Sequence, residues 1–224
     1  MTATKNTYSL TSLFSRSLLI GLVSIVPTLT FANPTPEALS MYNQAAQGDE
    51  EMVEAAYDAL KSTLDKEGAT PLTLVYLGST ETLQGRDAFL PWNKMKYVEK
   101  GLATIDKSLT LLNSIEQPVA EQARVQGLPE AYLTRAMAAT TYTSLPDMFN
   151  HFERGYDLYL DLLSEEEFSH QNFAATAWIY RYAITASIRA EDFAQAQSWL
   201  AVMEEKDSSN IETMTAKALV SQAQ

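Results

Sequence analysis

The sequence predicts an all-α protein built from antiparallel helix pairs. Apolar residues recur at helical spacing, most clearly in a stripe that steps by 3, 4, 3, 4 and 3 residues through Met95, Val98, Leu102, Ile105, Leu109 and Leu112. Such a stripe lies along one face of a helix. No run alternates apolar and polar residues over the length of a strand, and no Asn-Gly or Asp-Gly hairpin signal occurs. Turn residues divide the chain at short intervals, so consecutive helices should pack antiparallel.

Glycine, proline and short polar residues set the boundaries of nine predicted helices. These are residues 36–47, 49–67, 70–84, 91–115, 129–143, 146–164, 171–190, 192–206 and 210–222. One further stripe supports the sixth helix and consists of Phe149, Phe152, Tyr156, Tyr159 and Leu163. Another supports the eighth and consists of Phe193, Ala196, Leu200 and Met203. Residues 116–128 are predicted to form a mobile loop.

The first 32 residues are predicted to be a cleavable secretory signal peptide. Lys5 and Arg16 lie in a polar leader without acids, and residues 17–31 are uncharged and mostly apolar. This run is shorter than the roughly 20 apolar residues that span a bilayer. Thr30 and Ala32 supply small side chains at the −3 and −1 positions of a cleavage site after Ala32. The alternative is an uncleaved N-terminal anchor.

Export and composition together define the expected mature protein. We expect it to be periplasmic, or secreted if the host lacks an outer membrane, with residues 33–224 forming one domain and no membrane span after cleavage. The chain has no cysteine, which excludes disulfides and lipid attachment at a cysteine. Apolar burial alone must therefore stabilise the domain.

The acidic balance of the chain disfavours nucleic acid as a partner. The chain has 16 Lys and Arg against 28 Asp and Glu, a net charge of −12. Two of the bases and none of the acids lie in the leader, so the mature net charge is 14 − 28 = −14. A charge of this sign repels nucleic acid and anionic lipid surfaces.

One helix pair near the C-terminus resembles a tetratricopeptide repeat. In residues 177–206 an aromatic-rich first helix precedes a tight acidic turn. Phe193, Ala196 and Leu200 then fall where the second helix of that repeat carries its aromatic, small and large apolar residues. The resemblance implies that Ala196 is the small residue that lets two helices approach closely.

An earlier pair, residues 70–115, resembles the same repeat, and the pair 129–164 matches it only loosely. Residues 70–115 carry Leu77-Gly78 where the first helix of the repeat has its Leu-Gly step. The resemblance implies stacked helix pairs that form a tetratricopeptide-like α-α superhelix with a partner-binding surface. No proline closes the units, and the predicted helix 91–115 is too long for the repeat. An irregular α-helical bundle is therefore the alternative architecture.

No constellation of residues points to catalysis, a metal or a cofactor. The two histidines, His151 and His170, have no carboxylate three or four residues after them, and no HExxH motif occurs. Neither a phosphate-binding glycine loop nor a Gly-Xaa-Ser-Xaa-Gly elbow is present. Acidic runs such as 165–167 are expected to be solvated, since adjacent carboxylates share one environment and cannot divide acid and base roles. The sequence therefore predicts a non-catalytic protein without a cofactor.

The candidate partner-binding site is a basic strip around the start of the predicted helix 91–115. Residues 84–107 hold five bases and three acids, a net +2, whereas the rest of the mature chain sums to −16. The candidate residues are Arg86, Trp92, Lys94, Lys96 and Lys100. Lys96 and Lys100 share a helix face and could hold an acidic peptide or a terminal carboxylate. Alternatively, the lysines pair with the protein's own acids, such as Glu81, while Trp92 helps to bury the apolar stripe.

Two functions fit these observations. The first is a non-catalytic scaffold or adaptor that binds another envelope protein through a helical-repeat groove. The second is a small-molecule-binding protein associated with a transporter, with a pocket lined by aromatic residues. The aromatic residues in question are predicted to be mainly core and comprise Tyr132, Tyr142, Tyr156, Tyr159, Trp178, Tyr180, Tyr182 and Trp199. A shallow charged groove would favour the first function, and a closed aromatic cavity of roughly 300 Å³ or more would favour the second.

Overall fold

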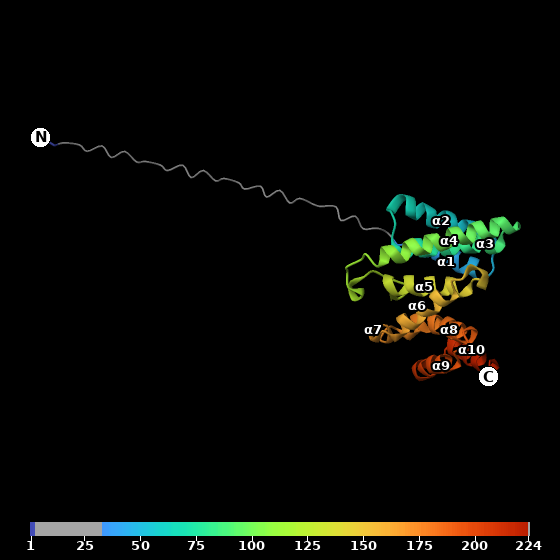
Figure 1. Cartoon of the computed structure of the whole chain (residues 1–224). Coiled ribbons are helices and arrows are strands. Elements are labelled where there is room, and N and C mark those ends of the chain that lie inside the picture. The colour runs from blue at the N-terminus through green and yellow to red at the C-terminus, as the bar shows by residue number, and fades with distance from the viewer. Residues whose placement is uncertain (3–32, 224) are drawn as a thin grey trace.

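A computed structural model describes residues 1–2 and 33–223 of the chain (Figure 1). Within residues 33–223 it has ten α-helices. These are α1 (Pro36–Ala46), α2 (Glu51–Glu67), α3 (Pro71–Asp87), α4 (Pro91–Leu112), α5 (Glu130–Ser144), α6 (Phe152–Ser164), α7 (Glu166–Ser169), α8 (Phe173–Arg189), α9 (Phe193–Asp207) and α10 (Ile211–Gln222). The all-α class predicted from the sequence is confirmed. The predicted signal peptide and its cleavage site lie outside the described residues, apart from residues 1–2.

Helices that follow one another in the chain pack against one another (Figure 1). The pairs are α1 with α2, α3 with α4, α5 with α6, and α8 with α9, and α10 packs on both α8 and α9. Helix α3 also contacts α1, α2 and α5, so it joins the N-terminal helices to the middle of the molecule. The result is a layered arrangement of packed helix pairs, which is compatible with a helical-repeat architecture.

Local sequence signals set the starts of these helices. The Thr70 hydroxyl accepts a hydrogen bond from the backbone N–H of Thr73 at 3.0 Å, and Pro71 follows at the first helical position. Asp192 accepts from the N–H of Gln195 at 3.1 Å in the same way. A capping oxygen satisfies a backbone N–H that has no partner within the helix. A proline at the first helical position loses no hydrogen bond, because the N–H that it lacks would have no partner within the helix.

Three regions differ from the sequence prediction, and one of them is the short helix α7 (Glu166–Ser169), which lies between two predicted helices. The predicted helix 146–164 is interrupted, because a 3-10 turn (η2, Asp147–Phe149) ends at Asn150 in the left-handed conformation (φ 53°), and α6 begins only at Phe152. Phe149 therefore does not belong to the stripe of α6. The predicted loop 116–128 contains a 3-10 turn (η1, Val119–Glu121) and leads into a two-stranded hairpin of β1 (Arg124–Val125) and β2 (Leu128–Pro129). Both central residues of the hairpin turn, Gln126 and Gly127, have positive φ. The sequence prediction missed this hairpin because the turn contains neither Asn-Gly nor Asp-Gly.

Helix α3 is buried on almost every side, although its sequence is rich in Thr and Ser. Two glycines make its close packing against α4 possible. A Cβ atom on Gly78 would lie 2.7 Å from the carbonyl oxygen of Gly101, and one on Gly101 would lie 2.5 Å from that of Gly78. The Leu77-Gly78 step, which resembles the Leu-Gly step of the tetratricopeptide repeat, therefore lies at a helix–helix contact.

The predicted apolar stripes have different outcomes. In α4 the residues Val98, Leu102, Ile105 and Leu112 are buried, so this stripe is confirmed. In α9 the residues Ala196 and Met203 are buried, but Phe193 is exposed and Trp199 takes the buried place expected for Leu200. No helix in the described part of the chain is both long enough and apolar enough to cross a membrane.

Candidate functional site

A cavity of about 690 Å³ lies between the C-terminal half of α3, the start of α4 and the end of α5. Tyr42 and Ala46 of α1 and Tyr182 of α8 contribute to its wall, as does the segment that follows α5. The site is therefore assembled from six parts of the chain. Its apolar lining consists of Leu83, Pro91, Met95, Val98, Leu145, Pro146, Met148 and Phe149.

Short side chains on α3 and α5 leave the space that forms this cavity. Ser79 and Thr82 line it from α3, and Thr140, Thr141 and Ser144 line it from α5. Ser79 and Thr141 meet between the two helices, with their hydroxyl oxygens 2.7 Å apart, and the other three side chains are equally short. At the same end of α3, a Cβ atom on a lining glycine, Gly85, would lie 2.6 Å from Val98 Cγ2, so glycine allows α4 to close one side of the cavity.

The hydroxyl groups of the lining are occupied within the protein. Thr82 donates to the carbonyl oxygen of Ser79 at 2.7 Å, and Ser144 donates to that of Thr140 at 2.6 Å. Thr140 and Thr141 donate to carbonyl oxygens one turn earlier in α5, at 2.8 and 3.0 Å. The Ser79 hydroxyl pairs with that of Thr141 at 2.7 Å. Because these donors are committed, this part of the wall offers a ligand the threonine methyl groups and hydroxyl oxygens that can accept a hydrogen bond, but no free hydroxyl donor.

Three aromatic rings complete the cavity: Tyr42, Phe149 and Tyr182. Tyr42 packs edge-to-face on Tyr76, with ring centroids 4.9 Å apart. Burial raises the pKa of Tyr42 far above its ordinary value, so its phenol stays protonated at neutral pH. The guanidinium carbon of Arg181 lies over the Tyr182 ring, 3.9 Å from the ring centroid.

The charged residues of the lining are Arg86 and Lys94, and both are basic. Arg86 binds Asp87 through two hydrogen bonds, Nε to Oδ1 at 2.5 Å and Nη2 to Oδ2 at 2.8 Å, and donates to the carbonyl oxygen of Ala45 at 3.0 Å. The hydrogen bond to Asp87 raises the pKa of Arg86. Lys94 Nζ donates to the carbonyl oxygen of Arg86 at 2.8 Å and forms no ion pair within residues 33–223. The lining therefore has a basic edge in a protein that is acidic overall.

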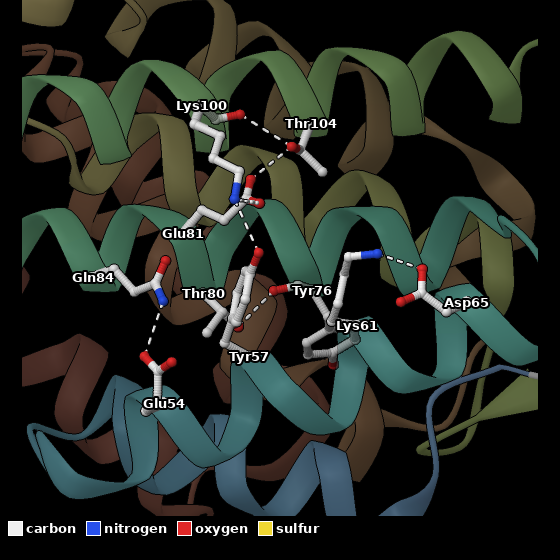
Figure 2. A network of polar contacts seen from close by, with 10 residues as sticks. All are labelled: Glu54, Tyr57, Lys61, Asp65, Tyr76, Thr80, Glu81, Gln84, Lys100 and Thr104. Atoms are coloured by element: carbon white, nitrogen blue, oxygen red, sulfur yellow. Dashed lines mark hydrogen bonds and ion pairs between the residues drawn. The ribbon is translucent and has the colours of Figure 1, made fainter.

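Lys100 takes part in an internal hydrogen-bond network. Figure 2 shows that Lys100 of α4 and Tyr57 of α2 converge beside Glu81 of α3. Lys100 Nζ lies 3.0 Å from a carboxylate oxygen of Glu81 and donates to the Tyr57 hydroxyl at 3.0 Å, while Thr104 donates to Glu81 at 2.6 Å. Partial burial lowers the pKa of Lys100, but the hydrogen bonds to Tyr57 and Glu81 outweigh burial and raise it overall. The Glu81 side chain is 2% exposed, so Lys100 is paired with a buried acid. Pairing with Glu81 was predicted from the sequence as the alternative to binding an acidic peptide or a terminal carboxylate.

The other two candidate residues lie on the surface. Lys96 is exposed. Trp92 is 66% exposed, so the expectation that its ring helps to bury the stripe of α4 was wrong. Together with Phe89, which precedes α4 and is also exposed, Trp92 forms an apolar tip at the α3–α4 turn. The five candidate residues thus separate into a cavity edge (Arg86 and Lys94), an internal pair (Lys100) and an exposed surface (Trp92 and Lys96).

The aromatic cluster of the C-terminal half is largely core, as predicted. Tyr132, Tyr142, Tyr159, Tyr180 and Trp199 are buried. Of the eight clustered residues, only Tyr182 lines the large cavity. Tyr42 and Phe149 were not among the eight, because they lie in distant parts of the sequence and no spacing rule connects them. The Ser and Thr residues of α3 and α5 were a usable signal, since they are polar residues in helices that are largely buried.

Metal chemistry receives no support from the described residues. Within residues 33–223 no group of three or more His, Asp or Glu side chains could hold a metal ion. His151 lies just before α6, with Nδ1 2.5 Å from the carbonyl oxygen of Phe149, and His170 is exposed at the end of α7.

Comparison with known proteins gave no significant match to a family model, to a curated protein or to a solved structure.

Proposed function

We propose that this chain is a non-catalytic binding protein that holds a small, largely apolar molecule in the cavity between α3, α4 and α5. The observation that carries the proposal is the cavity itself, with its volume of about 690 Å³ and its mostly apolar lining. Small-molecule sites have volumes of roughly 300–1,000 Å³ and combine apolar walls with a few polar groups. The cavity falls within this range, and Arg86 and Lys94 supply the polar groups.

The same geometry weakens the adaptor function. That function needs a continuous basic strip, but Lys100 is paired with the buried Glu81 and Lys94 lines the cavity. The exposed tip of Phe89 and Trp92, with Lys96 nearby in α4, is the observation that still favours protein binding. Adaptor activity through a tetratricopeptide-like surface is therefore our second candidate.

The predicted leader gives the proposal a cellular setting. A protein exported by cleavage after Ala32 would carry its ligand outside the cytoplasm and could deliver it to a transporter. No residue group in the sequence suggests that the ligand is chemically changed. We accordingly place the protein among exported carriers of small molecules.

The experiment measures binding of the neutral fluorophore N-phenyl-1-naphthylamine to protein expressed from the full-length chain. Ser144→Trp places a large ring in the cavity lining and should reduce binding by roughly tenfold or more. Ser164→Trp is the matched control, because Ser164 is also an exposed serine at the end of a helix, α6, but does not line the cavity. Equal binding by both variants, or no binding by the unmodified protein, would reject the proposal.

A further inference from the structure

We infer that the ligand is a monoanionic amphiphile, namely a single carboxylate on an aliphatic chain, with the carboxylate at Lys94 and the chain inside the cavity. This inference rests on the proposed function and adds the chemical class of the ligand. Four observations carry it: the charge at the basic edge, the direction of α4, the adaptable side chains of the lining and the occupied hydroxyl groups.

The charge at the basic edge of the cavity sums to one positive charge. Arg86 and Asp87 neutralise each other through their paired hydrogen bonds at 2.5 and 2.8 Å. Lys94 adds a cation that has no carboxylate partner within residues 33–223, and no Asp or Glu lines the cavity. One negative charge therefore complements this edge.

The donors at this edge favour a small anion over a phosphate group. Three of the five N–H donors of Arg86 have partners, in Asp87 and in the carbonyl oxygen of Ala45. Lys94 Nζ uses one of its three donor positions on the carbonyl oxygen of Arg86. Two donor positions at one site suit a carboxylate, whereas a dianionic phosphate would bring more charge than this edge balances.

The direction of α4 takes a bound chain from the cation into an apolar region. Lys94 and Val98 are four residues apart, so they lie on the same helix face about 6 Å apart along the axis. Met95 lies between them in the lining, and Met148 contributes a second methionine from the segment after α5. Methionine side chains adapt to irregular apolar shapes, which suits a flexible aliphatic chain.

The occupied hydroxyl groups disfavour a polar ligand such as a sugar. Ser79, Thr82, Thr140, Thr141 and Ser144 have partners within α3 and α5. The hydroxyl groups of a sugar could donate to these oxygens, but the sugar's own oxygens would find no free hydroxyl donor on this wall. Unpaired buried polar groups are costly, so an aliphatic chain fits this wall better.

The test compares dodecanoate, dodecan-1-ol and dodecyl phosphate as competitors of N-phenyl-1-naphthylamine, below the concentrations at which they form micelles. Dodecanoate should compete roughly tenfold more strongly than the alcohol, as expected for a charge-assisted hydrogen bond to Lys94. The preference should shrink as salt is added, because Lys94 is exposed. Dodecyl phosphate should compete no better than dodecanoate.

Lys94→Gln and Lys96→Gln form a matched pair two residues apart in α4. The ratio of dodecanoate to dodecanol affinity should fall to about one in Lys94→Gln and stay unchanged in Lys96→Gln. Equal competition by acid and alcohol in the unmodified protein, or a preference that survives Lys94→Gln, would overturn the inference about ligand class. Failure of the proposed function is distinguishable, since the neutral fluorophore would then not bind or would bind Ser144→Trp normally.

Discussion

Gly78 of α3 and Gly101 of α4 lie in mutual contact, and a Cβ atom on Gly101 would lie only 2.5 Å from the carbonyl oxygen of Gly78. This contact holds α3 against α4 and so helps to position two walls of the cavity. Helix propensity and packing make opposite predictions for the effect of Gly101→Ala on stability. Alanine is favoured over glycine in a helix by about 1 kcal/mol, whereas overpacking costs roughly 1–3 kcal/mol or more when backbone blocks the way.

We expect packing to decide the outcome, so Gly101→Ala should lower the free energy of unfolding by roughly 1–3 kcal/mol. Ala103→Gly, at an exposed position of the same helix, measures propensity alone and should cost about 0.5–1 kcal/mol. Urea denaturation followed by circular dichroism gives both values. Stabilisation by Gly101→Ala would show that the two helices are not in close contact at this point.

Lys100→Met should destabilise the protein by roughly 1–2 kcal/mol, because it leaves the carboxylate of Glu81 buried without its cation. Lys96→Met, at an exposed site four residues earlier, should change stability by no more than about 0.5 kcal/mol. Adding Glu81→Gln to Lys100→Met should restore part of the loss, since the buried group is then neutral. Equal effects of the two single lysine variants would contradict the internal pairing of Lys100.

Glu130→Gln should raise stability at neutral pH. Burial raises the pKa of Glu130 in the folded protein, although its hydrogen bond from the backbone N–H of Leu72 at 3.3 Å opposes this. The folded state therefore binds the proton of the Glu130 carboxyl more tightly than the unfolded state does. The stability that this protonated carboxyl contributes is lost as pH rises above the ordinary pKa of 4.5. The gain from Glu130→Gln should be present at about pH 7 and vanish below about pH 4. A gain that is independent of pH would refute this explanation.

Alkaline unfolding should be steep. Burial raises the pKa values of Tyr42, Tyr76, Tyr142 and Tyr159 well above the ordinary 10.0. Their stability contribution is complete below about pH 10 and is lost above it, since only the unfolded chain releases these protons. Four such groups give a slope of about 5 kcal/mol per pH unit once the unfolded tyrosines are ionised.

Tyrosinate absorbance and circular dichroism, recorded together from about pH 10 upward, test this prediction. The buried tyrosines should ionise only as helical signal is lost, and Tyr159→Phe should reduce the slope by about 1.4 kcal/mol per pH unit. Ionisation of the four buried tyrosines near pH 10 with helices intact would show that their rings are not buried as described.

The sequence predicted helices well where a single face is buried. The stripe of α4 was readable because Val98, Leu102 and Ile105 recur at helical spacing on one face. Helix α3 gave no comparable stripe, because Thr and Ser side chains are buried on several of its faces and are satisfied by hydrogen bonds such as that from Thr80 to the carbonyl oxygen of Tyr76, at 2.8 Å. The break before α6 was missed because the left-handed conformation of Asn150 is a single-residue event that periodicity does not report.

The cavity could not be predicted from the sequence, because its walls come from positions as distant as Tyr42 and Tyr182. Local charge did locate Arg86 and Lys94, which line it. The same charge pattern could not distinguish Lys94 from Lys100, since that difference depends on Glu81 in another helix. Local charge thus identified residues 84–107 as unusual. Tertiary packing then separates the cavity-lining residues Arg86 and Lys94 from Lys100, which pairs with Glu81.

The most direct measurement is the nuclear magnetic resonance spectrum of methionine methyl groups during titration with dodecanoate. Met95 and Met148 line the cavity, and Met148 lies at its rim with 70% of its surface exposed, whereas Met203 is buried in α9 and Met214 is 49% exposed on α10. If the cavity holds the ligand, the signals of Met95 and Met148 should shift with saturation while those of Met203 and Met214 stay in place. Shifts of all four signals, or of Met214 alone, would contradict a ligand bound between α3, α4 and α5.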